Sequence, residues 1–222
     1  MVEQRDVIGN IFQNMDEWRH LPAYQLERRA DIFFSTYLPG FLEHKFNNTV
    51  RGIIPEFPVH KATIEPGHTT NGSYKIDYLV TFHDSDRVVF LELKTDAAST
   101  RHEQQEYLTR AQSADMGKLF GGLEKIFDAT DHKDKYEHFF RLAEKAGLID
   151  ANKKVLRDKH DIQIVYLQPH AKDGDDKSMR IGFNEFADYV ARFHDPISQR
   201  FAHSLRHWAD VKAGSVAVPE GV

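Results

Sequence analysis

Apolar side chains recur every three or four residues along most of the chain, which is the pattern of amphipathic helices. The pattern predicts helices over residues 7–18, 23–38, 103–111, 115–148, 184–193 and 196–212. Within the fourth of these, the polar segment from Asp128 to Asp134 is expected to be the turn between two helices. Pro39-Gly40 is expected to end or kink the second helix, with another turn or two over 41–46.

Between these helices, alternating or continuous apolar runs predict extended segments. The predicted strands cover residues 53–59, 74–82, 87–93 and 161–168, with a short extended segment at 181–183. Two prolines place the first strand at a sheet edge, and turn-forming residues 83–86 make 74–94 a hairpin. On the strand 74–82, four apolar residues are expected to share one face, with Asp77 on the opposite face; they are Ile76, Tyr78, Val80 and Phe82. The order of elements predicts an α/β fold with a mixed sheet.

The length of 222 residues fits a single domain. Its expected parts are an N-terminal helix (1–20), a core (21–168) with a helical insertion at about 115–148, C-terminal helices (169–213) and a tail (214–222). A hydrophobic fraction of 41% with 16 phenylalanines is enough for a real core and excludes a disordered chain.

Composition excludes several classes of site and partner. The chain has no cysteine, so disulfides, thiolate zinc sites, iron–sulfur clusters and a cysteine nucleophile are excluded. A net charge of −5 argues against a polycation that coats nucleic acid. No signal peptide is expected after the acidic start, and the apolar run Val88–Leu91 is too short to span a bilayer, so we expect a cytoplasmic protein without membrane association. The 13 histidines lack ligand spacing: His203 and His207 share a helix face but have no third ligand.

Three charged residues come together in the predicted hairpin: Asp77, Glu92 and Lys94. Residues two apart on a strand face the same side, so Glu92 and Lys94 project together while Leu93 points to the opposite layer. If the strands pair as expected, Asp77 comes near Glu92. Burying such a group of charges is costly unless something uses them.

A hard divalent cation would relieve the repulsion between the two carboxylates. Mg²⁺ prefers oxygen ligands and binds through one or two carboxylates together with substrate phosphate. A lysine beside the cation can orient a water molecule and stabilise charge that develops on phosphorus. Two acids and a lysine therefore predict a site that hydrolyses phosphodiesters.

Asp77 followed by Glu92-Leu93-Lys94 across a hairpin, with a helix on either side, resembles the PD-(D/E)XK nuclease superfamily. Restriction endonucleases, Holliday-junction resolvases and RecB-type exonuclease domains belong to it. The resemblance implies a restriction-endonuclease-like αβββαβ core over about 23–168, with a mixed central sheet and extra helices at the N-terminus, in the insertion and at the C-terminus. The proline that precedes the family's aspartate is absent, because Lys75-Ile76 stands there.

The resemblance also implies roles for individual residues. Asp77, Glu92 and the Leu93 carbonyl would bind Mg²⁺ or Mn²⁺, and Lys94 would activate water. Many members add a glutamate from the first core helix; Glu27 is our preference for it, and Glu43 is the alternative.

Binding of nucleic acid is assigned to Gln104, Arg101, His102 and Arg28, which flank the predicted site. RecB-type members carry Gln-x-x-x-Tyr on the helix after the hairpin, whereas here Gln104 and Tyr107 are only three residues apart. We therefore expect a metal-dependent nuclease that acts on DNA rather than RNA, with a homodimer or a protein partner left open. The alternative is an inactive nuclease-like module that binds nucleic acid or a protein.

Overall fold

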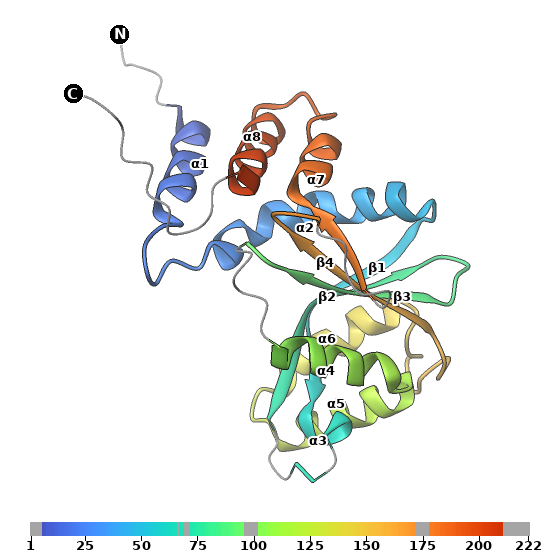
Figure 1. Ribbon diagram of the computed structural model, residues 1–222. Helices are drawn as coiled ribbons and strands as arrows, with labels where there is room; N and C mark the ends of the chain where they lie inside the picture. Colours follow the sequence, from blue (N-terminus) through green and yellow to red (C-terminus); the bar gives the residue numbers. More distant parts are fainter. Residues whose placement is uncertain (1–5, 66, 69–71, 96–101, 172–177, 211–222) are drawn as a thin grey trace, which may run out of the picture.

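The computed structural model describes residues 6–65, 67–68, 72–95, 102–171 and 178–210, with the backbone alone for 102 and 103. These residues form an α/β fold, as predicted, with eight helices around one open five-stranded mixed sheet (Figure 1). The elements are α1 (Val7–Trp18), α2 (Leu26–Phe46), β1 (Val50–His60), α3 (Lys61–Ile64), β2 (Ser73–Phe82), β3 (Arg87–Leu93), α4 (His102–Ser113), α5 (Met116–Ala129), α6 (Lys133–Lys145), β4 (Asp161–Gln168), β5 (Ser178–Gly182), α7 (Phe183–Val190) and α8 (Pro196–Asp210).

The strands lie in their chain order, β1-β2-β3-β4-β5. Strands β1, β2 and β3 pair antiparallel, and β3, β4 and β5 pair parallel. Strand β1 is an edge strand, as its prolines predicted. Strand β3 is central and joins the antiparallel half of the sheet to the parallel half.

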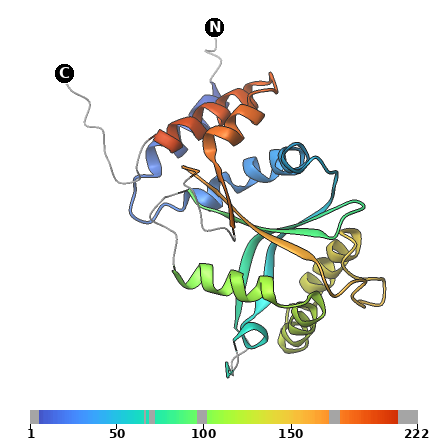
Figure 2. The same cartoon turned by 45° about the vertical axis from the view of Figure 1, so that its right-hand side comes forward.

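Helices cover both faces of the sheet. Helices α1, α2, α7 and α8 lie on one face, which we call the α2 face, and α3 to α6 lie on the other, which we call the α4 face (Figures 1 and 2). Strand β3 contributes Val89 and Leu91 to the core on the α2 face and Val88 and Phe90 to the core on the α4 face. Burial on both faces explains why this strand is a continuous apolar run in the sequence.

Helix α2 continues through Pro39 to Phe46, so of the two predicted outcomes at Pro39-Gly40 the helix does not end there, and the further turns expected over 41–46 belong to the same helix. Leu38, Phe41 and Leu42 flank the proline and are all buried. A proline inside a helix costs about 3 kcal/mol, while burying one large apolar side chain contributes roughly 1.5–3 kcal/mol. Packing on both sides of the proline therefore outweighs its local cost.

The shared face predicted for strand β2 is correct for Tyr78, Val80 and Phe82, but not for Ile76. Ile76 packs in the core on the α4 face, whereas Tyr78 packs on the α2 face. Alternation is interrupted at Asp77, opposite Glu56, whose φ of 52° departs from extended backbone. A local distortion of both strands thus occurs at the acidic residue itself.

The remaining predicted helices and strands are present within a few residues of their expected limits. In the described part of the chain, no helix combines the length and the apolar character needed to cross a membrane.

Candidate active site

The β2–β3 hairpin brings the two predicted acids together. Asp77 Oδ2 accepts a hydrogen bond of 2.7 Å from the Leu93 backbone N–H. Strand register pairs Tyr78 with Leu91, so Asp77 lies across from the end of β3 that carries Glu92. The Leu93 side chain packs in the core on the α2 face, which leaves Glu92 directed toward the α4 face.

Both carboxylate oxygens of Glu92 are hydrogen-bonded inside the protein. Oε1 accepts from the Tyr107 hydroxyl at 2.9 Å. Oε2 lies 3.3 Å from Lys94 Nζ and also accepts from the Gln104 side-chain amide. Glu92 is 0% exposed and Lys94 only 6% exposed, so the ion pair is shielded from water. Tyr107 and Gln104 both come from α4 and hold the carboxylate against the sheet.

The pKa of Glu92 is raised to about 8, first by burial and then by the nearby charge of Asp77. Lys94 and the Tyr107 hydroxyl act in the opposite direction and lower it. The pKa of Asp77 is also raised, again mainly by burial, although Lys94 and the Leu93 N–H oppose this shift. The charge of Asp77 therefore disfavours ionisation of Glu92, while the acid whose charge raises the pKa of Asp77 is Glu27. Such a pair is relieved either by a shared proton or by a cation.

Glu27 lies at the site and Glu43 does not. Glu27 Oε1 accepts a hydrogen bond of 3.2 Å from the backbone N–H of Thr95, just beyond Lys94. Glu43 instead accepts from the backbone N–H of Val50 at the start of β1, 2.9 Å away. The two glutamates are 16 positions apart on one helix, which separates them by about 24 Å.

A pocket of about 550 Å³ lies beside Asp77, between α2 and strands β1, β2 and β3. It is lined by Glu27, Arg28, Asp31, Pro55, Glu56, Lys75, Asp77 and Leu93. The pocket gives Asp77 access to a ligand, and Arg28 is one of its lining residues, while the predicted contact of Arg28 with nucleic acid stays a prediction. Asp31, another lining residue, accepts a hydrogen bond from the Tyr78 hydroxyl, and this bond ties α2 to β2 beside the pocket.

The oxygen donors around this pocket suit a hard cation. Asp77 and Glu92 are adjacent, and Glu27 is near enough for its charge to raise the Asp77 pKa. Within the described residues, no three acidic or histidine side chains converge as a complete ligand set. Mg²⁺ and Mn²⁺ need fewer than three such side chains, because these ions bind through one or two carboxylates and retain several water ligands. The residues present therefore fit the predicted cation.

The backbone around Lys94 is fixed from several sides. Its N–H donates to the Leu167 carbonyl of β4 at 2.9 Å. The next residue, Thr95, donates to Glu27, and its carbonyl accepts from the guanidinium of Arg19 at 3.3 Å. Arg19 is only 7% exposed. The turn after α1 thus reaches the end of β3 that carries Glu92 and Lys94.

Sequence reasoning missed Tyr107 and Arg19 as parts of the site. Tyr107 was compared with the tyrosine of the Gln-x-x-x-Tyr motif but was not assigned to the site, although its position three residues after Gln104 places both on one helix face. Arg19 lies 76 positions from Thr95, and no sequence pattern connects them. Arg101 lies outside the described residues, as does the side chain of His102, so their predicted contacts with nucleic acid stay predictions. Gln104 is at the site but contacts Glu92.

No protein-family model, curated protein or solved structure matches this chain. What the site does must therefore be argued from the geometry and chemistry of its own side chains.

Proposed function

We propose that this protein is a metal-dependent nuclease that hydrolyses phosphodiester bonds of DNA, on a restriction-endonuclease-like core with a PD-(D/E)XK site. The observation that carries the proposal is the cluster of Asp77, Glu92 and Lys94 at the end of β3. The charge of Asp77 raises the pKa of the adjacent Glu92 carboxyl, and the buried lysine lies 3.3 Å from Glu92.

In this proposal Asp77, Glu92, the Leu93 carbonyl and Glu27 hold Mg²⁺ or Mn²⁺. The ion would polarise the phosphate and lower the pKa of a bound water. Tyr107 and Gln104 keep the Glu92 carboxylate in one orientation, because each hydrogen-bonds one of its oxygens. Holding catalytic groups in a fixed orientation can account for a large part of the lowering of the activation free energy.

Lys94 has two tasks in this proposal. Its ammonium group orients the attacking water, and it stabilises negative charge that builds up on the phosphate oxygens. The water oxygen forms a bond to phosphorus, the bond to the leaving oxygen breaks, and the proton lost by water is passed to solvent. Because its backbone is tied to Leu167 and its Nζ to Glu92, Lys94 is held in place before substrate arrives.

The test compares the wild-type protein with Lys94→Ala on single- and double-stranded DNA, with Mg²⁺, with Mn²⁺ and with EDTA. We expect wild-type cleavage that requires the metal and falls by roughly 100-fold or more in Lys94→Ala. The matched control is Lys45→Ala, since Lys45 also pairs with a glutamate, Glu185, but at the far end of α2. This control should cleave like the wild type.

Two results would count against a nuclease. Wild-type protein that binds DNA without cutting it, in either metal, indicates the inactive nuclease-like module. Equal cleavage by wild type and Lys94→Ala indicates that the activity comes from another site or from a contaminant.

A further inference from the structure

Arg180 lies in a row with the catalytic acid across three neighbouring strands. The register pairs Glu92 of β3 with Tyr166 of β4, and Tyr166 with Arg180 of β5. Paired residues project from the same face of a sheet. Met179 and Ile181, the neighbours of Arg180 in the chain, pack on the α2 face, so Arg180 faces α4 with Glu92. Two strand spacings separate their backbones by about 10 Å.

The guanidinium of Arg180 lies over an aromatic ring, and among the described residues no carboxylate forms an ion pair with it. Its Cζ lies 5.8 Å from the centre of the Tyr166 ring. The side chain is half-buried, and its Nε is buried without a hydrogen-bond partner in the described part of the chain. No carboxylate of the described residues forms an ion pair with it. A half-buried cation with an unused donor gains free energy when an anion binds.

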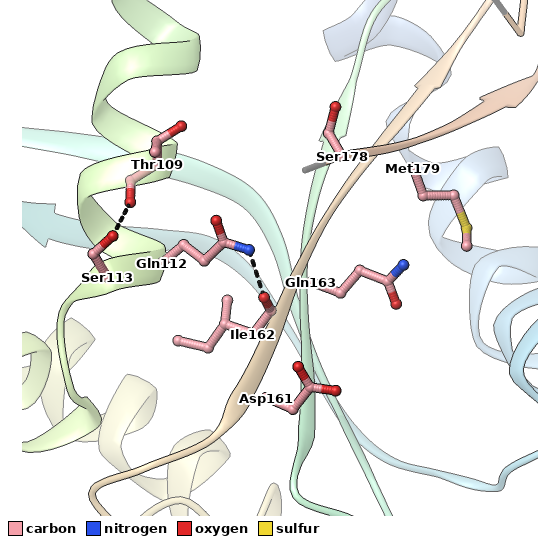
Figure 3. Close-up of a pocket in the computed structure, with 8 residues that line it drawn as sticks. All are labelled: Thr109, Gln112, Ser113, Asp161, Ile162, Gln163, Ser178 and Met179. Carbon is pink, nitrogen blue, oxygen red and sulfur yellow. Dashed lines mark hydrogen bonds between the residues drawn. The ribbon is translucent and has the colours of Figure 1, made fainter. Parts of the chain in front are cut away.

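A polar pocket of about 750 Å³ lies on the same part of the sheet. Figure 3 shows the pocket where α4 faces β4 and β5, with Ser178 and Met179 pointing to opposite sides of β5. Helix α4 lines it with Thr109, Gln112 and Ser113. Arg180 lies two residues beyond Ser178 on the same face, about 7 Å further along β5. Along β5 the arginine is therefore level with Glu92 and two residues from the pocket.

The geometry points to Arg180 as the binding site for a backbone phosphate of the nucleic acid, one that is not itself cleaved; this inference rests on the proposed nuclease function. The planar guanidinium suits two phosphate oxygens at once. Stacking on Tyr166 holds it in place before the ligand arrives. A phosphate contact at this position would fix how the strand lies across β3–β5, without reading its sequence.

The test measures binding rather than cleavage. Fluorescently labelled single-stranded and duplex oligonucleotides are titrated with protein in EDTA over a series of salt concentrations. We expect Arg180→Gln to weaken binding roughly 10-fold and to reduce the slope of log K against log salt by about 0.7 for single strands or 0.9 for duplex. Arg180→Lys keeps the charge and should retain most of the slope.

Arg192→Gln is the matched control. Arg192 also lies over a tyrosine ring, at 5.5 Å from Tyr189, but on the α2 face of the molecule. The binding curve and salt slope of the Arg192→Gln variant should equal those of the wild type. Thermal unfolding of each variant checks that it is folded.

The outcomes separate this inference from the nuclease proposal. An Arg180-dependent salt slope without any cleavage by wild-type protein supports the phosphate site and overturns the nuclease. Cleavage by wild type together with unchanged binding and slope in Arg180→Gln overturns the phosphate site. A wild-type protein that binds neither oligonucleotide overturns it as well, as does an equal loss in the Arg192→Gln control.

Discussion

Glu92 combines complete burial with three hydrogen-bonding neighbours, and this combination decides when it is charged. Lys94, Gln104 and Tyr107 all stabilise the carboxylate, yet its pKa is raised to about 8. Desolvation and the Asp77 charge therefore outweigh them. Near neutral pH and without a cation, the pair formed by Asp77 and Glu92 holds a proton.

This raised pKa makes folding stability depend on pH. A folded chain that binds a proton more tightly than the unfolded chain is stabilised below the ordinary pKa of 4.5, and it loses that contribution as the pH rises through about 8. We expect the free energy of unfolding to fall on the order of 3 kcal/mol between pH 5 and pH 8.5. The raised pKa of Asp77 acts in the same direction.

Thermal unfolding at the two pH values, with Glu92→Gln as the comparison, measures this effect. The variant cannot ionise at this position, so its melting temperature should change less with pH. Adding Mg²⁺ at pH 8.5 should restore part of the wild-type stability and none of the variant's, since the ion replaces the proton between the carboxylates. Identical pH profiles for both proteins would contradict the assignment.

At the scale of elements, α1 connects α8 to the end of β3 that carries Glu92 and Lys94. Asp16 accepts hydrogen bonds from Trp208 Nε1 at 2.7 Å, Ser204 Oγ at 3.1 Å and Arg200 at 3.2 Å, all on α8. Three residues later, Arg19 reaches the Thr95 carbonyl. Asp16 therefore anchors the helix whose end supports the peptide after Lys94.

Asp16→Ala should reduce the free energy of unfolding by roughly 2–3 kcal/mol, because it leaves the buried Trp208 N–H without its partner. Urea denaturation measures the loss. Glu17→Gln is the control, since Glu17 is exposed on the same helix and accepts only from Gln13. A stability loss of equal size in both variants would mean that the anchor is not specific to Asp16.

Most elements could be predicted because their signals are local. The apolar periodicity of α1 and α8 and the turn after Phe82 need no knowledge of the rest of the chain. The face of Ile76 was predicted wrongly, and the choice between an end and a kink of the helix at Pro39 stayed open, because both depend on what packs around these residues. Neither the buried neighbours of Pro39 nor the distortion opposite Glu56 has a sequence signature.

The candidate site divides in the same way. Asp77, Glu92 and Lys94 could be selected because strand alternation and hairpin pairing relate them directly. The choice between Glu27 and Glu43 needed the three-dimensional placement of α2. Arg19 and Tyr107 contact the site through packing, and the proposed role of Arg180 depends on sheet register.

At the scale of the whole molecule, one sheet separates two apolar cores that share its strands. Phe90 belongs to the core on the α4 face and Leu91 to the core on the α2 face, and both are at most 1% exposed. Because the same strand serves both cores, we expect the described part of the chain to unfold as one cooperative unit.

Phe90→Ala tests this cooperativity. The truncation should cost about 3–5 kcal/mol, and tryptophan fluorescence and far-ultraviolet circular dichroism should report the same lowered urea midpoint. Trp208 is buried in the core on the α2 face, whereas Trp18 is 47% exposed, so the fluorescence of Trp208 reports the core that the substitution does not touch. Ile32→Ala, at a side chain 67% exposed, is the control. Two separate transitions would show that the cores unfold independently.

The connection from Lys94 to Leu167 also has a consequence for the order of folding. The hairpin contact between Asp77 and Leu93 closes only a short loop of chain. In contrast, α4, α5 and α6 lie in the chain between β3 and β4, so pairing of these two strands closes a long loop. Short loops close far sooner than long ones, because less chain entropy is lost before the contact forms. We therefore expect the acids to meet early and the lysine to be fixed late. A chain that has folded only as far as its hairpin would hold the carboxylates of the site but not yet a positioned lysine.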